Sequence, residues 1–325
     1  MLYARLIVMR LLKAVVVLFL IVIFNFFLIH MAPGDPAAVL AGEAGATDEQ
    51  FLRQLREQFG LDQPIYVQLW RYVSGIAMLD FGYSYRQQMP VLDLILARLP
   101  ATLLLTGTAF VLSLALGILA GSMAAARVKK PSGSIIMALA LIFYATPLFW
   151  VALMAVVLFS VYLDWLPAYG MYTVGAGLDG FALILDVAKH LVLPATTLAL
   201  FFMAIYTRMT RASMLEASQQ DYVKTARAKG LSPRVIQRRH ILRNALLPII
   251  TLAGLQAGQM VGGAILTETV FAWPGIGRLM YEALMQRDYN LLLGIFFFSA
   301  ALVIVFNIIT DLVYRLADPR IKEGS

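Results

Sequence analysis

The sequence predicts an all-α integral membrane protein with about six transmembrane helices. Of its 325 residues, 61% are hydrophobic and only 14% are charged, and the mean hydropathy is +0.79, far outside the range of soluble proteins. Several apolar stretches are about twenty residues long, enough to cross roughly 30 Å of hydrocarbon as a helix. The basic residues gather in a few of the segments between these stretches, as they do on the cytoplasmic side of membrane proteins.

The first apolar stretch runs from about Leu11 to Met31 and is preceded by Arg5, Arg10 and Lys13. It is too long for the apolar region of a signal peptide, and no small-residue cleavage pattern follows it directly. We therefore predict a first transmembrane helix whose N-terminal end lies in the cytoplasm.

Residues 32–99 form a polar segment in which eight acidic residues outnumber five arginines. Thr47 and Gln50 have the spacing of a capping box, so a helix is expected to follow and to end at Gly60. Pro64 is expected to open a second amphipathic helix. The acidic balance favours the outer face of the membrane, and the segment is predicted to be an external helical cap.

Five further spans are predicted in the rest of the chain. Pro147 falls inside one of them, where it frees a backbone carbonyl that neighbouring helices or water must satisfy. Asp164–Lys189 is predicted to be an external loop, and a short interfacial helix, to about Gln286, is expected after the turn Trp273-Pro274-Gly275. The five spans are about Thr102–Ala126, Ser134–Leu163, Leu193–Met209, Ala245–Leu266 and Leu291–Val313.

The charge distribution sets the orientation of these spans. With both termini in the cytoplasm, the cytoplasmic segments hold eighteen Lys and Arg residues and the external segments hold eight. The segment from Arg208 to Arg243 has nine basic residues against two acidic ones, so it accounts for the whole net charge of +7. This clustering between spans favours membrane topology over nucleic-acid binding as the reason for the charge.

The polar stretch Ser213–Pro248, which we call the elbow, is too regular for a plain loop. Its first part, about Gln219–Lys229, is rich in helix formers and ends at Gly230, a residue suited to positive φ. A second helix is expected to begin at Ser232-Pro233 and to run towards Leu247. A helix–glycine–helix arrangement beside the membrane indicates a surface for a partner protein.

The elbow sequences DYVKTARAKGL and HILRNALLP resemble the cytoplasmic loop of bacterial ABC-importer permeases of the dipeptide/oligopeptide (peptide/nickel/opine) class. His30–Pro36 and Glu268–Gly277 match the same class in order and spacing, so the resemblance covers nearly the whole chain. The general importer pattern is Glu-Ala-Ala, three residues, Gly, whereas residues 224–226 here read Lys-Thr-Ala before Gly230. This departure is typical of the peptide branch and not of the sugar or phosphate branches.

The resemblance implies a type I ABC-importer permease fold in a bacterial inner membrane, with both termini cytoplasmic. Residues 1–100 would form the first span and the external cap. Residues 101–318 would form the core permease domain, with five spans and the elbow at 213–248, and residues 319–325 a cytoplasmic tail. The implied partners are a second similar permease, two cytoplasmic ATPase subunits, an external substrate-binding protein and membrane lipid.

By this resemblance the chain forms half of the translocation path of an ATP-driven importer for dipeptides or oligopeptides. Import of nickel, glutathione or opine-like solutes by the same architecture is an alternative, and a stand-alone secondary carrier is a second one. The middles of the predicted spans lack ionisable residues, which speaks against a carrier. The chain has no Gly-Lys dipeptide and therefore no phosphate-binding loop, so ATP and magnesium would bind to the ATPase subunits and no cofactor to this chain.

The resemblance implies that the first elbow helix docks the ATPase. Tyr222 and Ala226 are expected on one helix face, with Gly230 a further turn along. Arg227 and Lys229 are expected to contact acidic groups of a partner or lipid phosphates. The docking residues are Asp221, Tyr222, Thr225, Ala226, Arg227, Ala228, Lys229 and Gly230.

The fifth predicted span is rich in glycine and carries two glutamines. Glycines allow helices to approach closely, and lipid does not tolerate an isolated glutamine. This span is predicted to lie at the seam between two permeases or on the wall of the pathway, and a packing interface without substrate contact is the alternative. His30, His190 and His240 lie on different segments, and cysteine is absent, so no metal site is predicted. The seam or pathway residues are Gln256, Gln259, Gly258, Gly262 and Glu268.

Overall fold

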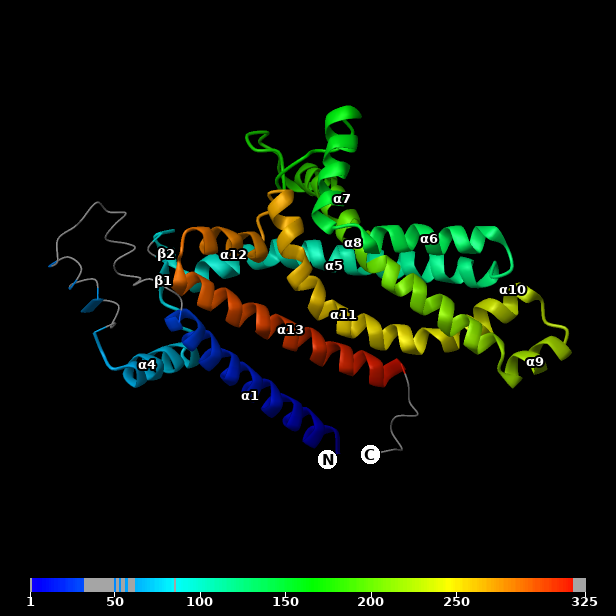
Figure 1. Cartoon of the computed structure of the whole chain (residues 1–325), viewed down its shortest axis with the longest axis horizontal. Coiled ribbons are helices and arrows are strands. Elements are labelled where there is room, and N and C mark those ends of the chain that lie inside the picture. The colour runs from blue at the N-terminus through cyan, green and yellow to red at the C-terminus, as the bar shows by residue number, and fades with distance from the viewer. Residues whose placement is uncertain are drawn as a thin grey trace. The chain divides into compact units, whose positions relative to one another are not determined.

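The computed structural model describes most of the chain as helix (Figure 1). Three predictions fall partly or wholly on residues outside the described part: residues 32–36 of the His30–Pro36 motif, the capping box with its helix up to Gly60, and the tail at 319–325. The described residues are 2–31, 50, 53, 56, 57, 62–84 and 86–317.

The chain divides into two compact units. Helices α5, α12 and α13 each contribute residues to both. Their bounds are Val91–Ala126 for α5, Ile276–Met285 for α12 and Tyr289–Ala317 for α13. The first unit comprises Met1–Leu99 and Leu279–Leu302, and the second comprises Pro100–Arg278 and Val303–Ser325.

In the first unit, α1 (Leu2–Met31) packs against α4 (Ile65–Ala77). His30, near the end of α1, joins the two helices: its Nδ1 lies 2.8 Å from the carbonyl oxygen of Phe26 and its Nε2 lies 3.0 Å from Gln68 Oε1. Pro64 precedes α4, as predicted. A two-stranded antiparallel ribbon of β1 (Tyr83–Ser84) and β2 (Met89–Pro90) leads into α5.

The second unit is organised around α8, a helix of 39 residues that packs against α6, α7 and α11 (Figure 1). Residues along much of its length are buried, because apolar and small side chains occur on all of its faces. The other elements of this unit are α6 (Pro131–Ala145), α7 (Leu148–Ala155), η1 (Val156–Tyr162), α8 (Gly180–Ser218), α9 (Asp221–Ala228), α10 (Pro233–Val235), η2 (Ile236–Leu242) and α11 (Arg243–Val270).

Within the described residues, four helices are long and apolar enough to span a membrane, and a bent pair makes a fifth candidate. The pair consists of α6 and the run Leu148–Tyr162, which meet at 102° where Thr146-Pro147 interrupts the helix. A proline cannot continue the hydrogen-bond ladder of the preceding helix, so the predicted single span from Ser134 to Leu163 is broken here.

Several predicted boundaries differ from the structure; for example, α5 begins at Val91 and not near Thr102, and α8 ends at Ser218 and not near Met209. Helix α8 begins at Gly180. The external loop, predicted as Asp164–Lys189, therefore ends before Gly180 and is shorter than predicted. Its interior Pro194 does not stop the helix. The second elbow helix does not end near Leu247. Elements α10, η2 and α11 follow one another without a break, so this helix and the predicted fifth span form one continuous helix.

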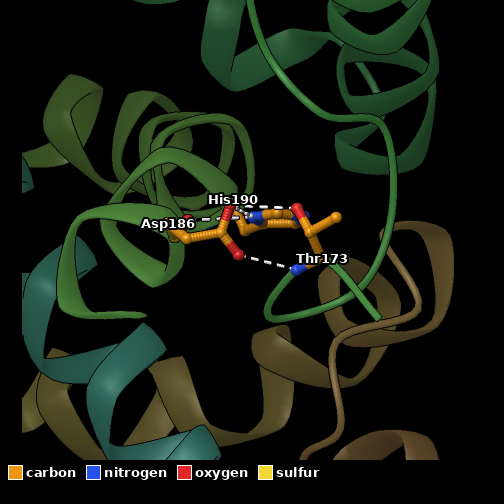
Figure 2. Close-up of polar contacts among 3 residues, drawn as sticks. All are labelled: Thr173, Asp186 and His190. Carbon is orange, nitrogen blue, oxygen red and sulfur yellow. Dashed lines mark hydrogen bonds and ion pairs between the residues drawn. The ribbon is translucent and has the colours of Figure 1, made fainter. Parts of the chain in front are cut away.

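A hydrogen-bonded cluster ties the loop between η1 and α8 to the first turns of α8 (Figure 2). The backbone N–H and the hydroxyl of Thr173 donate to the two carboxylate oxygens of Asp186, at 2.6 and 3.0 Å. His190 Nδ1 lies 2.9 Å from the carbonyl oxygen of Asp186. The N–H of Gly170 donates to the carbonyl of Phe271 at 2.9 Å, which holds the loop against the end of α11 as well.

Candidate functional site: the elbow and helix α11

The first elbow helix, α9, ends in a glycine-dependent cap. Gly230 has φ +72°, as the sequence predicted. Its N–H donates to the carbonyl of Arg227 at 2.9 Å, and the N–H of Leu231 donates to the carbonyl of Ala226 at 3.3 Å. These two bonds form a Schellman motif, which satisfies carbonyls that the end of the helix leaves open. The turn into α10 is therefore defined by the backbone.

One face of α9 is buried against the chain's own helices. Val223 is 0% exposed and Ala226 is 3% exposed. Ala226, predicted to dock the ATPase on the same helix face as Tyr222, instead packs against the chain's own helices, and its small side chain lets α9 lie close to them. The two residues pack in a cluster with Met214 and Ala217 of α8, Ile236 and Ile241 of η2, Ala245 of α11 and, at its edge, Ala125 of α5.

The opposite face of α9 is exposed and polar. Lys224 and Asp221 form an ion pair of 2.7 Å on it, and the Thr225 hydroxyl donates to the carbonyl of Asp221. At 100° per residue, Ala228 lies nearly opposite the buried pair and is the smallest side chain on the outer face. The helix thus presents an outer surface while its inner face anchors it. The exposed residues are Asp221, Tyr222, Lys224, Thr225, Arg227, Ala228, Lys229 and Gly230.

The predicted residues of α11 do not form one site. A Cβ added at Gly258 would lie 3.0 Å from Val303 of α13, and one at Gly254 would overlap Thr310 of the same helix. These two glycines serve packing within the chain. Gln259 and Gly262 instead lie on an exposed stripe of α11 with Thr251, Leu255 and Leu266, while Gln256 is half-buried with its Oε1 unpaired in the described structure.

Glu268, the last predicted pathway residue, is instead fully buried. Its carboxylate accepts a hydrogen bond from the Thr102 hydroxyl at 2.7 Å and another from the backbone N–H of Arg278 at 3.0 Å. The N–H of Ile276 donates to Thr102 Oγ1 at 2.8 Å. Glu268 and Thr102 together satisfy the free N–H groups at the start of α12, which the local sequence leaves uncapped.

The turn before α12 has the composition that this arrangement requires. A Cβ added at Gly275 would lie 2.2 Å from the Cδ of Glu268, so only glycine leaves room for the carboxylate. Trp273 is fully buried and donates its indole N–H to the carbonyl of Ala101 at 2.8 Å. The Glu268–Gly277 motif therefore stabilises the junction between the end of α11 and the start of α12.

This assignment predicts a large loss of stability when the Glu268 carboxylate is removed. Glu268→Ala leaves the Thr102 hydroxyl and the Arg278 N–H without their acceptor, so we expect a loss of about 3–5 kcal/mol, and Glu268→Gln, which keeps one acceptor oxygen, should lose less. The thermal midpoint of the purified chain in detergent measures both. Glu216→Ala, at an exposed position of α8, is the control and should change stability by less than about 0.5 kcal/mol. Loss of transport without loss of stability would assign Glu268 to the pathway instead.

One close contact between helices, that of α5 with α8, was not predicted from the sequence. Gly117 and Gly121 of α5 are one helical turn apart and face α8, where added Cβ atoms would lie 2.4 Å from Tyr206 Cβ and 2.5 Å from Thr210 Cβ. The signal was the Gly-x-x-x-Gly spacing, which brings small residues onto one helix face and lets two backbones approach.

Comparison with known families identifies the chain. A family model described as binding-protein-dependent transport system inner membrane component matches residues 117–323. The chain belongs to this family. A second model, for the N-terminal region of such membrane components, matches residues 3–106. The protein is therefore a non-catalytic permease subunit of a binding-protein-dependent ABC importer, and the elbow and α11 lie within the first match.

This permease is similar along nearly its whole length to permeases named for dipeptide or di/tripeptide transport. It is 38% identical over 327 residues to the dipeptide transport system permease protein DppB of Alkalihalophilus pseudofirmus, covering 96% of this chain and 98% of that protein. It is 38% identical over 319 residues to the protein of the same name in Escherichia coli K12, covering 93% and 94%. The di/tripeptide transport system permease protein DppB of Pseudomonas aeruginosa is 39% identical over 316 residues, again covering 93% and 94%.

The fold of the permease is also found among solved structures. An inward-facing conformation of the MetNI methionine ABC transporter aligns with a TM-score of 0.56 at 18% identity, over 69% of this chain and 96% of that one. This similarity confirms the predicted ABC-importer permease architecture at the level of the fold.

Proposed function

We propose that this permease forms half of the translocation path of an ATP-driven importer for dipeptides and oligopeptides. The similarity to dipeptide and di/tripeptide permeases, at 38–39% identity over more than nine-tenths of both chains, carries this proposal. The partners would be a second permease, two cytoplasmic ATPase subunits that bind ATP and magnesium, and an external substrate-binding protein. No cofactor would bind to this chain.

The proposed topology is a type I permease with six spans. These are the five candidate spans and α1, whose apolar part covers Leu12–Leu28. Both termini and the elbow would lie in the cytoplasm and α4 outside, in line with the charge distribution. Residues 1–100 would form the first span and cap, 101–318 the core and 319–325 the tail.

In the proposed mechanism, the outer face of α9 docks on an ATPase subunit. The inner face is packed on α8, η2 and α11, so a displacement of α9 would move the ends of two spans directly. Closure of the ATPase pair would in this way switch the permease between inward- and outward-open states, which is a two-state equilibrium biased by a partner. The exposed stripe with Gln259 and Gly262 would line the path or the seam with the second permease.

An uptake assay tests the substrate class. In a strain whose own peptide importers are deleted, this permease expressed with its partner subunits should support uptake of a radiolabelled dipeptide, and omission of this permease should reduce uptake to background. Unlabelled tripeptide should compete, whereas excess nickel should not. Nickel uptake that depends on this permease, with peptide uptake at background throughout, would select the alternative substrate.

A further inference from the structure

A basic surface lies beside α9 and is formed by other elements. It consists of Arg127, Lys129 and Lys130 in the turn between α5 and α6, and Arg238, Arg239 and Arg243 in η2 and at the start of α11. All six side chains are exposed. We call this set the basic patch.

The two halves of the basic patch come from distant parts of the sequence and are adjacent in the fold. The side-chain amide of Gln237 in η2 donates to the carbonyl of Ser122 in α5 at 3.4 Å. Ala125, at the end of α5, packs on the cluster that contains Ile236 and Ile241 of η2. The end of α5 and η2 are therefore in contact.

The basic patch also lies at the depth where a membrane surface is expected. Arg127 directly follows the last residue of α5, and α6 begins at Pro131. Arg239 and Arg243 lie within about 10 Å, along the helix axis, of Ala245, where the apolar part of α11 begins. Both halves are thus next to the ends of apolar helices.

The charges of the basic patch are not neutralised by the described chain. None of the six side chains has an acidic group within 4 Å among the described residues. The sequence from Leu94 to Leu163, which contains the α5–α6 turn, has no acidic residue at all. By contrast, Lys224 on α9 is already paired with Asp221. The described part of the chain therefore leaves these six charges available to an anion from outside the chain.

We propose that the basic patch binds the headgroups of anionic phospholipids at the cytoplasmic membrane surface. Clusters of four to eight Lys and Arg residues beside the cytoplasmic end of a span have the position and charge that anionic headgroups require. Arginine forms two parallel hydrogen bonds with a phosphate, and lysine adds a point charge. The bound lipid holds the end of α5 and η2 at the surface and so sets the position from which α9 projects.

Retention of anionic lipid by the purified protein tests this proposal directly. The full-length chain, with the subunits that accompany it from the native membrane, is reconstituted in nanodiscs of phosphatidylcholine containing about one-tenth phosphatidylglycerol and then examined by native mass spectrometry. The wild type should retain phosphatidylglycerol, and the double variant Lys129→Gln with Lys130→Gln should weaken its retention roughly tenfold or more. These are turn residues with exposed side chains, so the variant should fold. Arg238→Gln with Arg239→Gln should give the same loss.

The matched control removes two exposed basic charges from the predicted external side, with Arg71→Gln and Lys189→Gln, and should retain the lipid like the wild type. Equal retention by all variants would overturn the proposal. Loss of the ATPase subunits with unchanged lipid retention would also overturn it, because the basic patch would then belong to the ATPase interface. Neither readout depends on the transported solute, so the result is independent of the proposed substrate class.

Discussion

The substitution Gly121→Leu should prevent the chain from accumulating in the membrane. Even a Cβ at this position would lie 2.5 Å from Thr210 Cβ and 2.6 Å from the backbone oxygen of Thr207, so α8 would have to move away from α5. Enlarging a residue in a close-packed interior costs about 1–3 kcal/mol, and more where backbone is the obstacle. Since α8 packs on three other helices, its displacement should disrupt the whole second unit.

A matched control exists in the same helix. Gly107 has no atom within 4 Å of an added Cβ and is exposed, so Gly107→Leu should be tolerated in α5. Detergent-extracted chains carrying a fluorescent tag can be compared by size-exclusion chromatography. We expect a monodisperse peak for wild type and Gly107→Leu, and aggregate or no protein for Gly121→Leu. Similar yields for the two variants would show that the α5–α8 contact is not required.

The substitution Ala228→Arg should uncouple ATP hydrolysis from the binding protein while leaving the permease folded. Ala228 is exposed and lies opposite the buried Val223 and Ala226. A long charged side chain there would obstruct a docked partner without disturbing the packing of α9 on its own chain. Placing an unpaired charge in a buried protein interface costs several kcal/mol, which corresponds to roughly a hundredfold or greater loss of affinity. The measurement is the ATPase rate of the reconstituted complex with and without loaded binding protein.

Two companion variants make this result specific. Ala228→Ser keeps the side chain small and should retain stimulation. Ala226→Arg should behave differently from Ala228→Arg, because Ala226 packs against the chain's own helices, and its replacement should reduce the yield of folded permease. Normal stimulation by the Ala228→Arg complex would show that the outer face of α9 is not the docking surface.

The local features of the elbow could be predicted from the sequence because they depend on local chemistry. Gly230 stands where the backbone needs a positive φ, and Ser232-Pro233 marks the start of the next helix. The membrane class followed from apolar stretches that no soluble fold would carry. The short helix after Trp273-Pro274-Gly275 was also predictable, since proline and glycine interrupt the long helix there.

Only the tertiary structure decided which side of each helix is covered. Ala226 and Ala228 are the same residue type two positions apart, yet one is buried by α8 and η2 and the other is exposed. Glu268 resembles a pathway carboxylate in the sequence, but Thr102, more than 160 residues away, makes it part of a buried cap for α12. Residue type and spacing determine where a helix begins, ends or bends, whereas the partner of each face comes from elements distant in the chain, whose positions no local pattern records.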